Sequence, residues 1–192
     1  MTMLFKKKKE TLSTKEMIEI ENWLISECDP KIGQISSEED LSSKLKLKVE
    51  YVAAKDLNEY VEAELTPIDD DRYNGLIRVN SSCMGKSFAY LHEIMHYIYD
   101  VGIGKKVDRV FTRMARGHTE GAHEQKINYM AAAFTMRYDK IEPRIRAYDE
   151  SRPRMDAVKF VDELSREYKQ PRSVVVRRIQ EIRRIRRKKL RS

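Results

Sequence analysis

The chain has 192 residues, of which 41% are hydrophobic and 36% are charged, and its formal net charge is +7. This composition is typical of a highly charged globular protein with one sizeable core, and no apolar run approaches the roughly 20 residues of a membrane span. Cys28 and Cys83 lie far apart, and the start MTMLFKKKKE has no apolar signal region, so we expect reduced thiols in a cytoplasmic protein.

Two helices are predicted before any strand. Ser13 and Glu16 have the spacing of a capping box, and the apolar face behind them continues to Asp29-Pro30, which predicts a helix over 14–29. The acidic run that begins at Ser36-Ser37 predicts a second, short helix that ends near Leu45.

Strands follow. Apolar and charged residues alternate over 45–53 and again over 61–66, and this period of two predicts two amphipathic strands. A turn at Asn74-Gly75 leads into a third strand over 76–80. We therefore predict an α+β fold in which a small three-stranded antiparallel sheet packs on helices.

The motif His92-Glu93-Ile94-Met95-His96 follows the third strand. Residues 86–100 contain neither proline nor glycine and carry apolar residues at helical spacing, which predicts a buried helix. Two histidines four apart lie on one face of a helix, where both imidazoles can bind the same zinc ion. Glu93, between them, is the natural base for a water that the metal activates. The alternative is that both histidines are ordinary polar positions on this helix.

The rest of the chain is predicted to be mostly helical. The stretch after Gly104 predicts a loop with some helix over 107–115, and a further helix runs over 122–136. Periodic segments over 155–168 and from a cap at Ser173 complete a C-terminal helical appendage that resembles a helix-turn-helix. We place a catalytic domain at 1–140 and this appendage at 141–192.

A third ligand decides the class of zinc site. The short-spaced signature requires glycine at 99 and histidine at 102, but the chain has Tyr99 and Gly102. The remaining candidates are His118, Glu120, His123 and Glu124. Glu124 opens a helix, and Asn128 lies one turn later, where its side chain can hold a ligand histidine. His123 points about 100° away from Glu124 on the same helix. These positions favour Glu124 as the third ligand.

Several segments together carry a family resemblance. The strand LIRVN before FAYLHEIMH, the helix EQKINYMAAAFTM and the helix that begins SVVVRRIQEI resemble the ImmA/IrrE family of zinc metallopeptidases over 45–182. The resemblance implies that Glu124 is a zinc ligand, with Asn128 retained and Ile127 where alanine is usual. Arg137 stands where the family often has proline. Known members are intracellular proteases of mobile elements, prophages and stress responses, so the resemblance implies cleavage of a helix-turn-helix repressor.

The expected chemistry is metal-assisted amide hydrolysis. His92, His96 and Glu124 hold zinc, and Glu93 moves the proton from the attacking water to the leaving amine. The residues that could stabilise the developing oxyanion are His118, His123, Tyr129 and Tyr138. A substrate peptide is expected to add to a sheet edge formed by the third strand, next to the metal.

Charge suggests an alternative function. Residues 171–192 contain ten Arg or Lys and one Glu, a net charge of +9, so the remaining 170 residues carry −2 of the total of +7. A basic end of this kind predicts a weak contact with nucleic acid or another acidic surface. The chain could thus be a DNA-binding regulator with a structural or vestigial zinc site. A third alternative, which rests on chemistry shared across folds and not on charge, is hydrolysis of a non-peptide amide by the same residues. Glu93 argues for an enzyme, because a structural site does not require a base.

Overall fold

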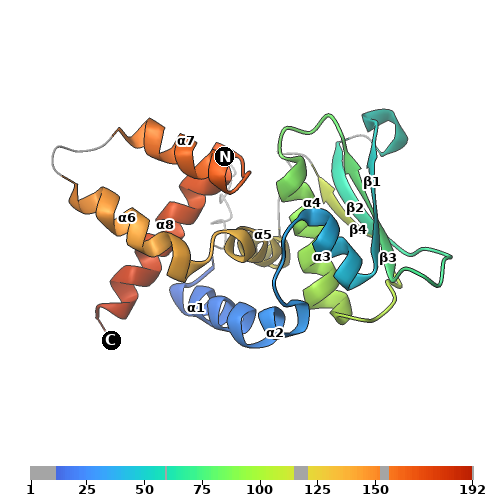
Figure 1. Cartoon of the computed structure of the whole chain (residues 1–192), viewed down its shortest axis with the longest axis horizontal. Helices are drawn as coiled ribbons and strands as arrows, with labels where there is room; N and C mark the ends of the chain where they lie inside the picture. Colours follow the sequence, from blue (N-terminus) through green and yellow to red (C-terminus); the bar gives the residue numbers. More distant parts are fainter. Residues whose placement is uncertain (1–11, 59, 115–120, 152–155, 192) are drawn as a thin grey trace, which may run out of the picture.

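A computed structural model describes residues 12–58, 60–114, 121–151 and 156–191. Within these ranges, no helix is both long enough and apolar enough to cross a membrane. Helices lie on one side of a single sheet, and the C-terminal helices lie on the far side of α5 from the sheet (Figure 1). The structure is therefore α+β, as the sequence predicts.

The predicted first helix is correct at its start and wrong at its end. The capping box is present, with the Glu16 amide donating to Ser13 Oγ over 3.2 Å ahead of α1 (Thr14–Trp23). The chain continues through a π-helical turn (Leu24–Cys28) and α2 (Asp29–Ile32), although the sequence predicted a stop at Asp29-Pro30. Proline fits the first turn of a helix because it needs no amide partner there, and Gly33, at a φ of 71°, makes the actual end.

The sheet has four strands and is mixed, which corrects the predicted three-stranded antiparallel sheet. Its order is β1-β3-β2-β4, formed by β1 (Leu47–Val52), β2 (Val61–Thr66), β3 (Gly75–Asn80) and β4 (Phe111–Met114). The three predicted strands exist, but β3 lies between β1 and β2 and is parallel to β1. Alternation shows that a segment is a strand but not which strand it pairs with.

Strand β4 occupies the region where a loop with some helix was predicted. It pairs antiparallel with β2, with Arg113 opposite Ala63 and Phe111 opposite Leu65. Four residues are too few for a period of two to be distinguished from a loop. The edges of the sheet are β1 and β4, so the expectation that the third strand forms an edge is also wrong.

Helices cover one face of the sheet. The predicted short helix is α3 (Glu38–Leu45), capped by Ser37, and it contacts β1. Helix α4 (Lys86–His96) contacts β2, β3 and β4, and a π-helical turn (Tyr97–Gly102) extends it. Helix α5 (Ala122–Thr135) packs against α4 on the side away from the sheet (Figure 1). The interface between α4 and α5 is where the predicted site residues meet.

The C-terminal part of the described chain consists of α6 (Tyr138–Glu150), α7 (Ala157–Glu167) and α8 (Arg172–Lys189). Helix α8 begins one residue before Ser173, after Pro171, so the predicted serine cap is wrong. Part of the segment predicted over 155–168 lies outside the described residues. The helix-turn-helix character of α7 and α8 and the domain boundary at residue 140 stay predictions.

A buried arginine ties the C-terminal helices to the rest of the core. Arg178 on α8 is fully buried, pairs with Glu21 on α1, and donates to the Met136 carbonyl at the end of α5 over 2.9 Å. Its guanidinium also lies 5.1 Å from the centroid of the Tyr129 ring. A charge in the core requires such partners, so these contacts hold α1, α5 and α8 together.

Candidate metal centre

The two histidines of the motif lie side by side on α4. No residue from Lys86 to His96 breaks a helix, so positions four apart share a face. His92 and His96 are 1% and 2% exposed, and their Nε2 atoms are 3.2 Å apart. Two buried imidazoles that point the same nitrogen at one location form half of a metal site.

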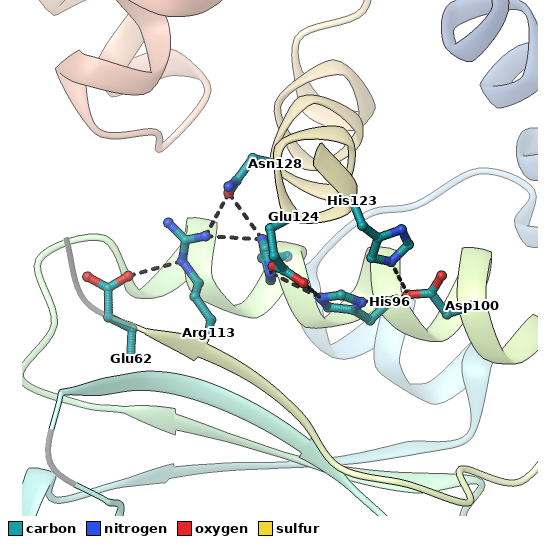
Figure 2. A network of polar contacts seen from close by, with 8 residues as sticks. Glu62, His96, Asp100, Arg113, His123, Glu124 and Asn128 are labelled. Carbon is teal, nitrogen blue, oxygen red and sulfur yellow. Dashed lines mark hydrogen bonds and ion pairs between the residues drawn. The ribbon is translucent and has the colours of Figure 1, made fainter. Parts of the chain in front are cut away.

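Glu124 completes this group from α5, as the sequence predicts. Its Oε2 lies 3.1 Å from His92 Nε2, and its Oε1 lies 3.5 Å from His96 Nε2. Each of the three side chains offers a ligand atom within 4.8 Å of the others. Figure 2 shows the carboxylate of Glu124 directed at His96 from the start of α5. The group is buried on the histidine side and partly open at Glu124, which would leave access for a substrate.

The outward nitrogens of both imidazoles contact other side chains. His92 Nδ1 is 3.1 Å from Asn128 Oδ1, the contact predicted for Asn128 from its place one turn after Glu124. His96 Nδ1 is 2.7 Å from Asp100 Oδ2 (Figure 2). An acceptor at Nδ1 holds the proton there and leaves Nε2 free to bind a metal. The sequence reasoning missed Asp100, although it lies four residues after His96 on the same helix.

The charges around the group suit a cation. Burial lowers the pKa of His92 to about 4, so its imidazole is neutral at pH 7. Burial also acts to lower the pKa of His96, but hydrogen bonds to Asp100 and Glu124 outweigh it and raise the pKa to about 9. The pKa of Glu124 is well below its usual range because His92 and His96 hydrogen bond to it, despite burial. A divalent cation between these ligands would replace a proton on His96.

Glu93 is the unusual residue of this region. It is completely buried, and neither carboxylate oxygen has a hydrogen-bond partner among the described residues. Burial raises its pKa to about 8. Buried carboxyl groups are normally hydrogen-bonded, and exceptions are frequent where catalysis needs a poised proton carrier. The three converging ligands and this free carboxyl group together fit a catalytic metal centre.

Arg113, which the sequence reasoning missed, lies beside the centre. It comes from β4, where no strand was predicted, and its Nη1 lies 2.6 Å from Asn128 Oδ1 and 3.0 Å from His92 Nδ1. On its other side, Nε donates to Glu62 Oε2 over 3.0 Å (Figure 2). No sequence pattern pointed to this arginine, because its place depends on the pairing of β2 with β4.

The other candidate ligands that the structure describes lie outside the group formed by His92, His96 and Glu124. His118 and Glu120 lie outside the described residues. His123 Nε2 is 3.0 Å from Asp100 Oδ2, and with His96 these residues form a second group that could hold a metal. This second group shares His96 with the first and lacks His92 and Glu124. Cys83 is half-buried and belongs to neither of the two groups found among the described residues.

The described candidates for oxyanion stabilisation lie in different parts of the structure. Tyr129 donates its hydroxyl proton to Glu21 over 2.8 Å, and the ring of Tyr138 lies under Lys189. Both tyrosines therefore contact the C-terminal side of the molecule rather than the metal ligands. The His123 ring lies 5.9 Å from the His96 ring, so among the described candidates His123 is the one at the centre.

Comparison with known proteins adds one finding. A peptidase family model, described as the IrrE N-terminal-like domain, matches residues 45–180. The match spans the four strands described above, both helices of the candidate centre and the first half of α8. Neither the curated proteins nor the solved structures contain a match to the chain.

Proposed function

The chain belongs to the IrrE N-terminal-like family of peptidases, and from this premise we propose that it is a zinc-dependent metallopeptidase that hydrolyses a peptide bond. The family indicates a peptidase that uses a metal. One observation supports the proposal most strongly: His92, His96 and Glu124 converge, and Glu93, the residue after His92, has a buried carboxyl group with no hydrogen-bond partner among the described residues. Two imidazoles and one carboxylate are the ligands of a class of catalytic zinc sites with an open fourth position.

The proposed roles follow from the positions of the side chains. His92, His96 and Glu124 would hold the ion, and zinc, when bound, would supply Lewis-acid polarisation of the scissile carbonyl. Without a metal, Glu93 holds a proton at pH 7. With a divalent cation bound nearby, its carboxylate form would be favoured, and this carboxylate would accept a proton from the attacking water and deliver it to the leaving amine. Neither carboxylate oxygen of Glu93 has a hydrogen-bond partner in the described part of the chain, so no such bond has to be broken first. His123 is the proposed donor to the oxyanion.

A substrate strand would bind at the edge of the sheet beside the centre. Strand β4 is that edge. The side chain of Arg113 on β4 lies within hydrogen-bond distance of Asn128 and of the proposed ligand His92. We propose that the substrate pairs with β4 in an extended conformation, which positions its backbone by main-chain hydrogen bonds. An open groove of about 1200 Å³ continues from Arg113 and Phe88 to Ser173 on α8 and would accept the neighbouring residues.

The proposed substrate is a helix-turn-helix transcriptional repressor, whose cleavage would derepress genes of a mobile element, prophage or stress response. This part of the proposal comes from family likeness. The proposed location is the cytoplasm, where such a repressor acts. The presumptive substrate is a small helix-turn-helix repressor encoded by a neighbouring gene.

The test is incubation of the purified chain with this repressor. We expect cleavage with zinc, none with a chelator, and recovery when zinc is added back. Glu93→Gln should retain the metal and lose turnover. A wild-type cleavage rate for Glu93→Gln would refute the assignment of the base, and cleavage unaffected by the chelator would refute a metallopeptidase.

A DNA-binding regulator with a structural or vestigial zinc site is the second candidate. The specific observation is the surface of α8, where Arg183, Arg184, Arg186 and Arg187 line a hollow of about 270 Å³. Arg183 and Arg186 pair with Asp149, which neutralises part of this charge. Gel shifts at increasing salt test the idea, since binding through phosphates weakens steeply with salt. The buried free carboxyl group of Glu93 favours the peptidase, because a structural site has no use for it.

A further inference from the structure

Asn128 has a carboxamide whose two ends have opposite hydrogen-bonding properties. If His92 binds a metal through Nε2, it carries its proton on Nδ1 and needs an acceptor there. The amide oxygen of Asn128 is such an acceptor, whereas the amide nitrogen is a donor and would oppose this proton. A rotation of the amide by half a turn exchanges the two ends. Some other group must therefore keep the oxygen directed at His92.

Arg113 is placed to do this. Its Nη1 lies 2.6 Å from Asn128 Oδ1, and a guanidinium group only donates hydrogen bonds. A bond from Arg113 is therefore possible only when the amide oxygen faces it. In that orientation the same oxygen is 3.1 Å from His92 Nδ1. Two donors, Arg113 and the protonated Nδ1 of His92, then share one acceptor, which brings their nitrogens to 3.0 Å.

Arg113 is itself held in place. Its Nε donates to Glu62 Oε2 over 3.0 Å, and its guanidinium carbon lies 4.8 Å from the centroid of the Phe88 ring. The side chain is only 14% exposed. Glu62 lies on β2 and Arg113 on the paired strand β4, so the sheet fixes both ends of this ion pair. A planar guanidinium group held in this way loses little conformational entropy when it donates a hydrogen bond to Asn128.

We propose that Arg113 is a positioning residue, which orients the Asn128 carboxamide so that His92 presents Nε2 to the metal. This inference rests on the proposed metal site but not on the identity of the substrate. An opposite arrangement is conceivable from the same contacts: if Arg113 donated to His92 Nδ1, the imidazole proton would sit on Nε2 and block the metal. The two arrangements predict opposite effects of removing Arg113 on metal affinity.

The first measurement is the zinc dissociation constant of the full chain, by competition with a chelator, with the absorption spectrum of the Co²⁺ form as a second readout. Arg113→Leu should weaken zinc binding about 10- to 100-fold and alter the Co²⁺ spectrum. Arg113→Lys should fold, since it keeps the charge near Glu62, and should bind zinc with intermediate affinity because it lacks the planar fork. Unchanged or tighter zinc binding in both variants would overturn the proposal.

Arg109 provides a matched control. Its guanidinium carbon also lies over an aromatic ring, 4.9 Å from the centroid of Phe111, and it is exposed. Arg109→Leu removes the same charge next to the same strand without touching Asn128. Its zinc affinity should equal that of the wild type. An equal loss in both leucine variants would mean that general charge, and not positioning, is responsible.

A rescue experiment separates positioning from a merely structural role. Asn128→Asp replaces the amide by a carboxylate, which accepts hydrogen bonds at either oxygen and needs no orientation. The double variant Arg113→Leu/Asn128→Asp should therefore recover zinc affinity to within a few-fold of Asn128→Asp alone. A loss that persists in the double variant would overturn the proposal. If the wild type binds zinc but cleaves no peptide, the peptidase proposal fails while this one stands.

Discussion

Replacing Glu93 by glutamine should stabilise the metal-free protein while it removes activity. Burial raises the pKa of this carboxyl group from its ordinary value of 4.5 to about 8, so the folded chain holds a proton there that the unfolded chain releases. Stability therefore falls as pH rises between these two values, by about 1.4 kcal/mol per pH unit. At pH 7 the burial of this carboxyl group lowers the free energy of unfolding by about 3 kcal/mol. Glutamine has a similar shape and no charge, so it avoids this cost.

The assay is urea unfolding in the presence of a chelator, at a series of pH values from 4 to 8. We expect Glu93→Gln to be more stable than the wild type by about 3 kcal/mol at pH 7, and the difference to vanish below about pH 4.5. Glu19→Gln, at a side chain that is 60% exposed, is the control and should show no such trend. A difference between Glu93→Gln and the wild type that does not change with pH would refute the assigned burial cost.

The same variant should lose activity by about 10²- to 10⁴-fold, the usual contribution of a general acid–base group. Its zinc content should be unchanged, because Glu93 is not among the three converging ligands. A residue that destabilises the fold and is needed for turnover is expected at an active site, where function and stability favour different side chains. Equal activity and lower stability in Glu93→Gln would contradict both parts of this reasoning.

Three further predictions concern the ligand, the buried ion pair and the sheet. Glu124→Ala should lose most zinc affinity and, with it, the rise in melting temperature on zinc addition, which thermal unfolding with and without zinc measures. Arg178→Leu should lower the free energy of unfolding in urea by about 3–5 kcal/mol, because it leaves the buried carboxylate of Glu21 without its charged partner. Arg177→Leu, at an exposed neighbouring position, should change this free energy little. Gly75→Ala should lower the free energy of unfolding by about 1–3 kcal/mol, since the added Cβ would lie 2.5 Å from Val107 Cγ2. A second substitution, Val107→Ala, should restore part of this free energy, because it removes the contacting methyl group.

The local features of the chain were predictable because their causes are local. The capping box at Ser13 and Glu16 depends on residues three apart, and the structure confirms it. The short helix predicted after Ser36-Ser37 is also present, as α3. The shared face of His92 and His96 follows from helix geometry alone. Asp100, one turn after His96, could have been found by the same rule. Asn128 was found in this way, because it lies one turn after Glu124.

The errors concern contacts between distant segments. The predicted strands were correct, and β2 and β3 are antiparallel as predicted. The prediction was wrong for β3 and β1, because β3 inserts between β1 and β2 and is parallel to β1. Strand β4 was missed since four residues give too little pattern, and with it Arg113 was missed. The helix that begins at Thr14 continues past Pro30 because the first turn of α2 tolerates proline, which a rule about breakers does not capture.

Sequence patterns predicted the candidate metal-binding pentapeptide 92–96, the helix that carries it and Glu124 as the favoured third ligand, because spacing along a helix dictates which side chains share a face. Tertiary contacts, in contrast, bring Glu124 on α5 within 3.5 Å of both histidines and carry Arg113 on β4 to Asn128. They also bury Glu93 without a hydrogen-bond partner among the described residues. These depend on how separate elements pack and pair. Such packing results from the whole core, and no local pattern records it.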